Sequence, residues 1–283
     1  MILHHTTIRF LFALAFLMAG NTDPALSQEL KNEGTVEVTS VKSNNAFHVN
    51  AENRNPFSIT LTIKVTGENF KLNTRQPITK VVKGNSTKHL VSVYAKEKGK
   101  SFEFSTNYNW VMGNTLARHN DTYIYSLPYQ TGRSYRIGQG YNGSFSHSGS
   151  IRYSIDFMMP LKTQVHAARG GRVVQIYEDS DRGGASDEFK DASNFITIEH
   201  NDGTFAEYAH LSRNGVLVNL GQKVFEGQVI GLSGNTGYSS GPHLHFMVIK
   251  INEDGTSISL PVRFKTKSGV VDTLNESFYY TAN

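Results

Sequence analysis

The 283-residue sequence predicts an all-β protein in which an immunoglobulin-like β-sandwich precedes a second β-rich domain. Short runs of alternating or β-branched residues follow one another from about residue 34 to residue 127, and turns rich in Gly, Asn, Pro or Lys separate them. Runs of this length and spacing are typical of the strands of a β-sandwich. After Ser144, similar runs alternate with glycine turns, and no long segment has the period of a helix.

Residues 1–27 are predicted to be a secretory signal peptide. Arg9 precedes an apolar run at residues 10–20, and Ala25 and Ser27 are small residues at the positions that signal peptidase reads. The apolar run is shorter than the roughly 20 residues that a transmembrane helix needs. We therefore expect an exported protein, periplasmic or secreted, without a stable membrane anchor after cleavage. An uncleaved N-terminal anchor is the alternative interpretation.

Residues 28–127 are expected to form the first domain, an accessory β-sandwich. Its predicted strands are residues 35–41, 46–50, 58–65, 78–82, 88–94 and 101–108. The segment contains His48, His89 and His119, but no pair of histidines at the spacing of metal ligands. We interpret these three as structural or surface residues.

Residues 128–143 are expected to form a linker, and residues 144–283 are expected to form the second domain. Within the second domain, Gly221, Gly227 and Gly231 fall at predicted hairpin corners. Glycine readily adopts the positive φ angles that such corners require.

The composition excludes several classes of protein. The chain contains no cysteine, which excludes disulfide bonds, thiolate metal sites, a cysteine nucleophile and lipid attachment at an N-terminal cysteine. Stability must then come from burial of apolar side chains, for which two domains of this size are sufficient. The formal charge of +4 is mild and forms no dense Lys/Arg block, so no nucleic-acid site is expected. A mildly basic exported protein is suited to an anionic polymer or cell surface.

His243 and His245 are the first candidates for chemistry. They follow a Gly/Ser/Pro-rich segment, residues 233–242, and begin an apolar run that is typical of a strand. Residues two apart on a strand point to the same face, so both imidazoles face the same way. They can bind a metal together, or one can bind it while the other acts on the substrate. A pair of surface or core histidines is the alternative.

Two further segments hold histidine or aspartate. His147 precedes Asp156 by nine residues, and His210 ends an alternating run. A catalytic zinc site typically takes three N or O protein ligands and leaves a fourth position for water. The chain supplies enough ligands for such a site and two spare imidazoles for acid–base or oxyanion work, although spacing alone does not assign them. The sequence contains neither the H-E-x-x-H nor the G-x-S-x-G motif.

The surroundings of these residues resemble a known family. The segments are Tyr-Ala-His-Leu at residues 208–211, a glycine-rich stretch that ends in Pro-His-Leu-His-Phe at residues 234–246, and one that contains Ile-Asp-Phe at residues 153–160. From about residue 136 to residue 265, the chain is similar to peptidase family M23, the LytM or lysostaphin-type zinc endopeptidases.

The resemblance implies an M23-type catalytic domain of the β-sheet or barrel-sandwich kind, with one zinc ion per chain. It implies that His147, Asp156 and His245 bind the zinc ion, with His210 and His243 unligated beside it as catalytic residues. It also implies a substrate in bacterial peptidoglycan, whose peptide cross-links or stem peptides the enzyme hydrolyses.

The chain departs from the common pattern of the family in one respect. Many members place the first histidine four residues before the aspartate, where this chain has Arg152, so it resembles the variant with eight intervening residues. Tyr141 is a candidate oxyanion donor, or a tyrosine packed at the domain junction.

Two alternative functions compete with the peptidoglycan peptidase. They are a catalytically inactive LytM-like regulator of a cell-wall amidase and a secreted peptidase of Gly-rich proteins. Inactive regulators typically lack some metal ligands, whereas all five expected positions are filled here. The complete set of ligands and imidazoles favours an intact enzyme.

Overall fold

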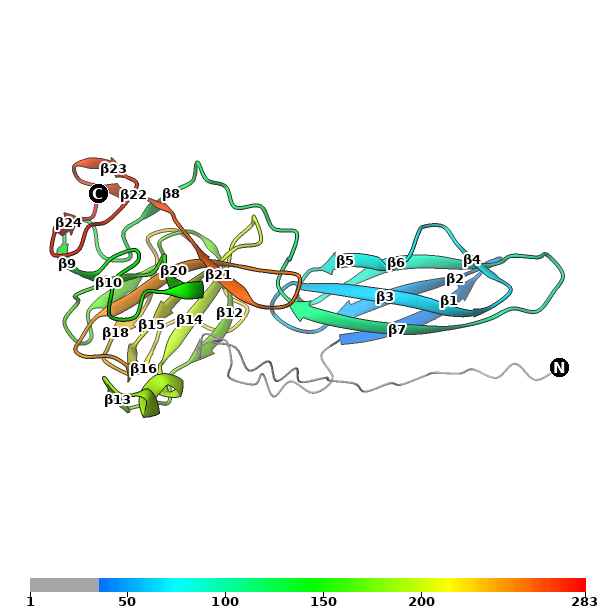
Figure 1. The fold of residues 1–283 in the computed structure, drawn as a ribbon, viewed down its shortest axis with the longest axis horizontal. Helices are drawn as coiled ribbons and strands as arrows, with labels where there is room; N and C mark the ends of the chain where they lie inside the picture. Colours follow the sequence, from blue (N-terminus) through cyan, green and yellow to red (C-terminus); the bar gives the residue numbers. More distant parts are fainter. Residues whose placement is uncertain (1–35) are drawn as a thin grey trace. The chain divides into compact units, whose positions relative to one another are not determined.

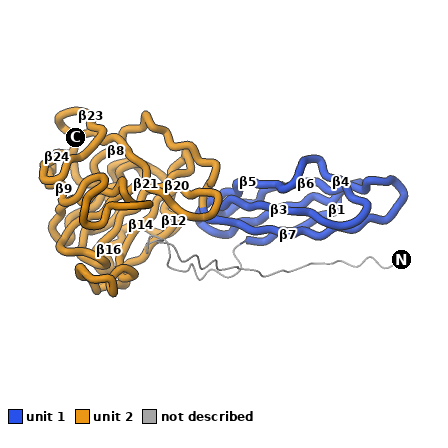
Figure 2. The backbone as a smooth tube through the Cα atoms, in the orientation of Figure 1, with its two compact units in different colours: residues 1–21, 29–112 blue, residues 22–28, 113–283 orange. Residues whose placement is uncertain are grey.

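The computed structural model describes residues 36–283, so the predicted signal peptide, residues 1–27, lies outside the described residues. The chain forms two compact units, which divide between Met112 and Gly113 (Figure 2). Apart from two short 3₁₀ helices, the regular structure of the described residues consists of β-strands, so the predicted all-β fold class is confirmed (Figure 1). No helix among the described residues is long and apolar enough to cross a membrane.

The first unit contains the strands that its sequence predicts. They are β1 (Val36–Ser43), β2 (Ala46–Asn53), β3 (Ile59–Glu68), β4 (Phe70–Leu72), β5 (Ile78–Val82), β6 (Ser86–Ala95) and β7 (Glu103–Met112). Only the three-residue β4 has no counterpart among the predicted strands, because so short a run carries no periodic pattern.

The strands of the first unit form a four-stranded sheet, in the order β1-β2-β6-β4, and a three-stranded sheet, in the order β5-β3-β7. The ring of Phe47 in β2 lies 5.4 Å from that of Phe104 in β7, so the sheets contact each other. The division into four and three strands is that of a constant-type immunoglobulin domain. The order differs, because in that domain the fifth strand joins the four-stranded sheet and the sixth joins the other.

The second unit consists of many short strands and two 3₁₀ helices. They are β8 (Ile124–Ser126), β9 (Ser134–Gln139), η1 (Gly149–Ile151), β10 (Ile155–Phe157), β11 (Gln164–His166), β12 (Gly171–Tyr177), β13 (Gly183–Gly184), η2 (Asp187–Ala192), β14 (Phe195–Glu199), β15 (Phe205–Ala209), β16 (Leu211–Val216), β17 (Lys223–Val224), β18 (Val229–Ser233), β19 (Gly237–Tyr238), β20 (Leu244–Ile251), β21 (Ser257–Leu260), β22 (Arg263–Thr266), β23 (Gly269–Val271) and β24 (Tyr279–Thr281).

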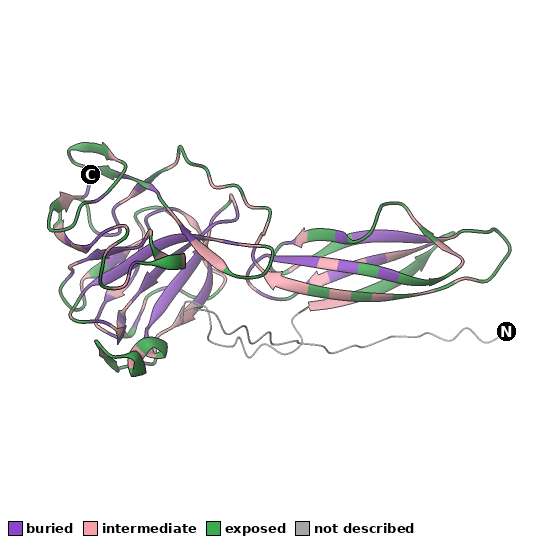
Figure 3. Ribbon diagram, in the orientation of Figure 1, coloured by how far each residue is buried: buried purple, intermediate pink, exposed green. Residues whose placement is uncertain are grey.

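A nine-stranded sheet organises this unit. Its order is β17-β12-β14-β15-β20-β10-β9-β24, and β21 pairs with β20 beside this path. Smaller sheets, β11-β18-β16 and β23-β22-β8, lie outside it. The central strands β14, β15 and β20 are buried along almost their whole length, as Figure 3 shows.

The two faces of the large sheet carry different side chains. Tyr208 in β15 and Phe246 in β20 belong to the main apolar core, together with Val165 of β11 and Ile230 of β18, so this face packs against the small sheet. Because side chains alternate along a strand, the neighbour of Phe246, His245, points to the opposite face. The sheet therefore separates a continuous core from a face that carries polar groups.

The segment expected to be a linker, residues 128–143, belongs to the second unit. β9 lies within it and pairs with β10 and β24 in the nine-stranded sheet. Ile137 is fully buried, and a Cβ atom on Gly138 would lie 2.4 Å from the sulfur of Met158. Gly138 thus permits β9 to pack closely against Met158. The second unit begins at Gly113, earlier than expected, and includes β8, which pairs with β22.

Candidate metal centre

Strand pairing brings Asp156 and His245 side by side. β10 and β20 are antiparallel neighbours, and their register places Asp156 opposite His245. On the other side of β20, Ala209 at the end of β15 lies opposite His245, so His210 leaves β15 beside the same pair. His243 immediately precedes β20.

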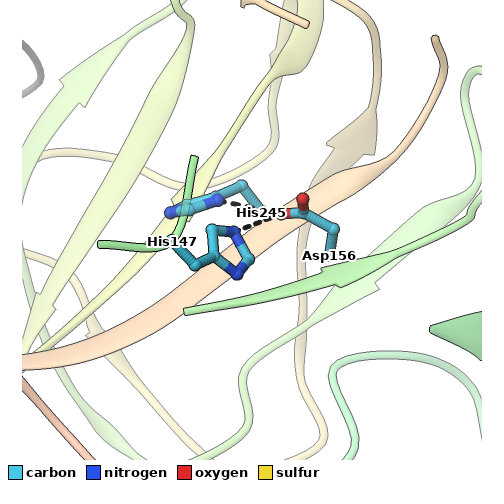
Figure 4. A group of neighbouring side chains, drawn as sticks. All are labelled: His147, Asp156 and His245. Atoms are coloured by element: carbon cyan, nitrogen blue, oxygen red, sulfur yellow. Dashed lines mark hydrogen bonds and ion pairs between the residues drawn. The ribbon is translucent and has the colours of Figure 1, made fainter. Parts of the chain in front are cut away.

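His147 reaches this group from the loop between β9 and η1. Its Nε2 atom lies 3.3 Å from Oδ1 of Asp156, and Nδ1 of His245 lies 2.9 Å from the same oxygen (Figure 4). One ligand atom from each of the three side chains lies within 4.8 Å of the other two. The exposed fractions are 1% for His147 and 9% each for Asp156 and His245, so the cluster is largely shielded from solvent.

Main-chain carbonyl groups fix the tautomers of three imidazoles. Nδ1 of His147 lies 2.8 Å from the carbonyl oxygen of Gly140, and Nδ1 of His243 lies 2.8 Å from that of Gly241. Nδ1 of His210 lies 2.6 Å from the oxygen of Thr236. A carbonyl oxygen only accepts, so Nδ1 donates in each case. In the neutral ring Nε2 then carries no hydrogen and is available as a ligand or a base.

His210 and His243 lie next to each other beside the cluster. Their ring centroids are 4.6 Å apart, and the ring of His210 is 5.7 Å from that of His245. Nε2 of His243 is 3.7 Å from Oδ1 of Asp156. His210 has a φ angle of 61°, a left-handed conformation that is uncommon for residues other than glycine. Its amide donates to Oγ of Ser193 at 3.1 Å, which helps to hold the backbone there.

The carboxylate of Asp156 controls the electrostatics of the group. Burial alone would favour its neutral form, but the nearby imidazoles of His147, His245 and His243 hold the pKa of Asp156 well below its usual value. Burial also disfavours the charged form of His147, yet the interactions with Asp156 raise the pKa of His147. For His210, burial and the neighbouring imidazoles of His243 and His245 hold the pKa well below its usual value.

The donor set fits a zinc ion. Two imidazole nitrogens and one carboxylate oxygen are a common ligand set of catalytic zinc sites. The Nε2 atom of His147 is buried and makes no hydrogen bond within the described residues, as expected of an atom aimed at a cation. A proton on His245 Nδ1 satisfies Asp156 at 2.9 Å, and a cation can take the place of that proton.

The five site residues expected from the sequence lie together in the structure. Gln139, which the sequence did not single out, lies opposite Asp156 in β9 and donates a hydrogen bond to its Oδ2 at 3.1 Å. Tyr141, the candidate oxyanion donor, uses its hydroxyl in this structure for two hydrogen bonds to the backbone of Val262. Its hydroxyl donates to the carbonyl oxygen of Val262 at 3.1 Å and accepts from the amide of the same residue at 3.0 Å.

Comparison with protein families and curated proteins agrees with the resemblance. Residues 150–259 match the model of peptidase family M23. Lysostaphin from Staphylococcus simulans is 34% identical over 138 residues, which are 48% of this chain and 26% of that protein. The peptidoglycan DD-endopeptidase ShyA from Vibrio cholerae is 42% identical over 94 residues, 33% of this chain and 19% of that protein. The chain thus spans less than half the length of these relatives.

The chain was also found to resemble two solved structures in part. The catalytic domain of lysostaphin from Staphylococcus simulans is 33% identical, covers 46% of this chain and 88% of that domain, and has a TM-score of 0.32. A zinc-containing peptidase from Vibrio cholerae is 18% identical, covers 83% of this chain and 87% of that chain, and has a TM-score of 0.38. The family match and the curated relatives confirm the family expected from the sequence: residues 150–259, which include Asp156, His210, His243 and His245, belong to a peptidase family M23 domain.

Proposed function

We propose that the chain is an exported zinc metalloendopeptidase that hydrolyses peptide bonds of bacterial peptidoglycan. The observation that carries the proposal is the approach of two imidazole nitrogens to one carboxylate oxygen, at 3.3 Å and 2.9 Å, inside an M23 domain. The names of relatives such as ShyA and lysostaphin support a cell-wall substrate. Export is supported by the sequence of residues 1–27 alone.

In this proposal His147, Asp156 and His245 hold one zinc ion. A bound zinc ion supplies Lewis-acid chemistry, because it polarises a carbonyl group and makes water more acidic. The three side chains contribute a single negative charge, so the site with the ion keeps a net positive charge. The sheet fixes Asp156 and His245, and the loop hydrogen bond to Gly140 fixes the ring of His147.

His210 and His243 move protons in this proposal. Nδ1 of His210 donates to a carbonyl oxygen, so its Nε2 carries no hydrogen and can accept a proton from water. The same holds for His243, whose Nδ1 donates to the carbonyl oxygen of Gly241. The imidazole that has taken up the proton can then donate a hydrogen bond to the oxygen of a tetrahedral intermediate. Both imidazoles need only small movements, because main-chain carbonyls already orient them.

The test uses full-length protein, mature at its N-terminus and loaded with zinc, on purified sacculi and on oligoglycine peptides. A peptidoglycan endopeptidase releases peptide fragments from sacculi, and a chelator stops the release. A peptidase of Gly-rich proteins instead cleaves oligoglycine and leaves sacculi intact. A regulator of an amidase cleaves neither, and that outcome would overturn the proposal.

A further inference from the structure

The side chain of Gln139 joins the carboxylate of Asp156 to the loop that carries His147. It is 6% exposed and makes four hydrogen bonds. Its Oε1 accepts from the amides of Phe145 and Ser146 at 2.8 Å and 2.9 Å. Its Nε2 donates to Oδ2 of Asp156 at 3.1 Å and to Oγ of Ser146 at 2.9 Å. Because main-chain amides only donate, Oε1 must be the atom that faces them, and the NH₂ group must face Asp156.

This arrangement makes the two oxygens of Asp156 different. Oδ2 accepts the hydrogen bond from Gln139, whereas Oδ1 lies between Nε2 of His147 and Nδ1 of His245. Without the donor on Oδ2, the carboxylate could rotate about its Cβ–Cγ bond, a torsion with a broad energy minimum. Gln139 therefore selects the oxygen that faces the histidines.

The same side chain limits the freedom of the His147 loop. Residues 148–155 separate His147 from Asp156, so the chain between them is too long to fix one relative to the other. Gln139 accepts hydrogen bonds from two successive amides of this loop. Gly140, which follows Gln139 in the sequence, accepts the hydrogen bond from Nδ1 of His147. Gly143 permits this approach, since a Cβ atom there would lie 2.1 Å from Cγ of Gln139.

Resting on the proposed function, we propose that Gln139 is a positioning residue for the metal centre. Its amide directs Oδ1 of Asp156 alone toward the zinc ion and holds the His147 loop at ligand distance. Groups that orient metal ligands from behind in this way typically change metal affinity by roughly 10–100-fold when they are removed.

The test compares the zinc affinity of full-length variants by competition with a chromophoric chelator. Gln139→Met keeps the length of the side chain and removes all four hydrogen bonds, so its zinc affinity should fall roughly 10–100-fold. Gln228→Met is the matched control, because Oε1 of Gln228 accepts from the loop amide of Phe225 at 3.1 Å and makes no contact with the cluster. Its zinc affinity should equal that of the wild type.

A second measurement separates orientation of Asp156 from general stability. In Gln139→Glu the side chain still accepts from the loop amides but has no hydrogen for Oδ2 of Asp156. The visible absorption spectrum of cobalt-substituted protein reports ligand geometry, and it should change in Gln139→Glu and Gln139→Met but not in Gln228→Met. The unfolding midpoint of the chelated proteins measures how much each substitution destabilises the fold, because the amides of Phe145 and Ser146 lose their acceptor in Gln139→Met.

The outcomes distinguish this proposal from the proposed function. If the wild type binds zinc and both Gln139 variants keep its affinity and its cobalt spectrum, Gln139 has no positioning role. If affinity falls only in step with the unfolding midpoint of the chelated protein, its role is general stability and the proposal is overturned. Failure of the wild type itself to bind zinc would overturn the proposed function, and this proposal with it.

Discussion

The nitrogen that each histidine presents follows from where that histidine lies. His245 stands on β20 directly opposite Asp156, and side chains of cross-strand neighbours begin only about 5 Å apart. Its near nitrogen, Nδ1, therefore reaches the carboxylate. His147, His210 and His243 come from loops or strand ends and extend their far nitrogen, Nε2, while a carbonyl oxygen takes Nδ1. The backbone thus determines which ring nitrogen of each histidine carries the hydrogen before any ligand binds.

This geometry predicts different effects of two alanine substitutions. His245→Ala removes a donor that lies 2.9 Å from Asp156, so the protein should lose most of its zinc. His210→Ala leaves the His147, Asp156 and His245 cluster complete, so it should retain zinc and lose turnover by about 10²–10⁴-fold, the usual effect of a proton-transfer group. Elemental analysis and peptide release from sacculi measure the two effects on the same preparations. Equal zinc loss in both variants would contradict this division of roles.

The turn of the β14–β15 hairpin carries a buried histidine whose protonation we expect to destabilise the fold. His200 is 3% exposed, begins the turn between the strands, and donates from Nδ1 to the carbonyl oxygen of Gly170 at 2.9 Å. Burial, with the charge of Arg169 nearby, lowers the pKa of His200 from 6.5 to about 4. The charge of Asp202 opposes this effect only in part.

We expect stability to fall as the pH decreases from 6.5 to about 4. In this window the unfolded chain binds a proton at His200 that the folded protein does not bind. Proton binding therefore stabilises the unfolded state and lowers the free energy of unfolding. The expected loss is about 3 kcal/mol in the free energy of unfolding. His200→Asn keeps a donor toward Gly170 and removes the titration, so its urea unfolding curves should change less between pH 7 and pH 4.

Asp202 sets the lower pH limit of this test, because below it a second group also changes the stability. Burial favours its neutral form, but hydrogen bonds from Thr204 and Arg169 lower the pKa of Asp202 from 3.8 to about 2. Its contribution to stability is complete above the unfolded-state value and is lost only as the pH falls from 3.8 through about 2. A wild-type curve that stays flat down to pH 4 would show that His200 is not the acid-sensitive group.

The strands that the sequence predicts well have a periodic pattern of their own. β5 has the predicted bounds, residues 78–82. His243 and His245 lie at the start of a strand, β20, as the preceding turn and the following apolar run predict. β4 and β9 were missed because their pattern is short or interrupted by glycine, and they become strands through pairing with distant residues. Tertiary contacts override local signals in such segments.

Gln139 shows more clearly what could not be predicted from the sequence. Its side chain contacts Phe145 and Ser146 because of the conformation of the loop, and Asp156 because of the register of β9 with β10. No local sequence motif predicts either the loop conformation or this register. Glu207 is a similar case. Its alternation with apolar neighbours predicts a solvent-facing side chain, but it is only 1% exposed, because alternation identifies a face and not what covers it.

At the scale of the whole second unit, the metal and the fold are separable. The core that joins Tyr208, Phe246, Val165 and Ile230 lies on the face of the large sheet opposite the metal cluster. Chelation should therefore abolish peptidase activity and leave a β-rich circular dichroism spectrum. Zinc at 100 times its dissociation constant should still raise the free energy of unfolding by about 2.7 kcal/mol, because it binds the folded state. Global unfolding on chelation would contradict the separation.

The boundary between the units decides how the role of the first unit can be tested. A chain that begins near Gly138 would lack β8 and most of β9, which pair with β22, β10 and β24 in the second unit. A chain that begins at Gly113 keeps all these pairings. The first unit exposes many lysines, among them Lys64, Lys71, Lys80, Lys83 and Lys88, and carries no metal-binding cluster within residues 36–112.

We predict that the first unit positions the enzyme on its polymer. Residues 113–283 alone should bind zinc and cleave small peptides at the rate of the full chain, because the cluster and its supporting strands are complete. They should act more slowly on sacculi, since the exposed lysines that favour an anionic polymer are lost, and the difference should shrink at high salt because salt screens surface charges. If the truncated protein instead cleaves small peptides several-fold faster than the full chain, the first unit is an inhibitory cover and not a positioning domain.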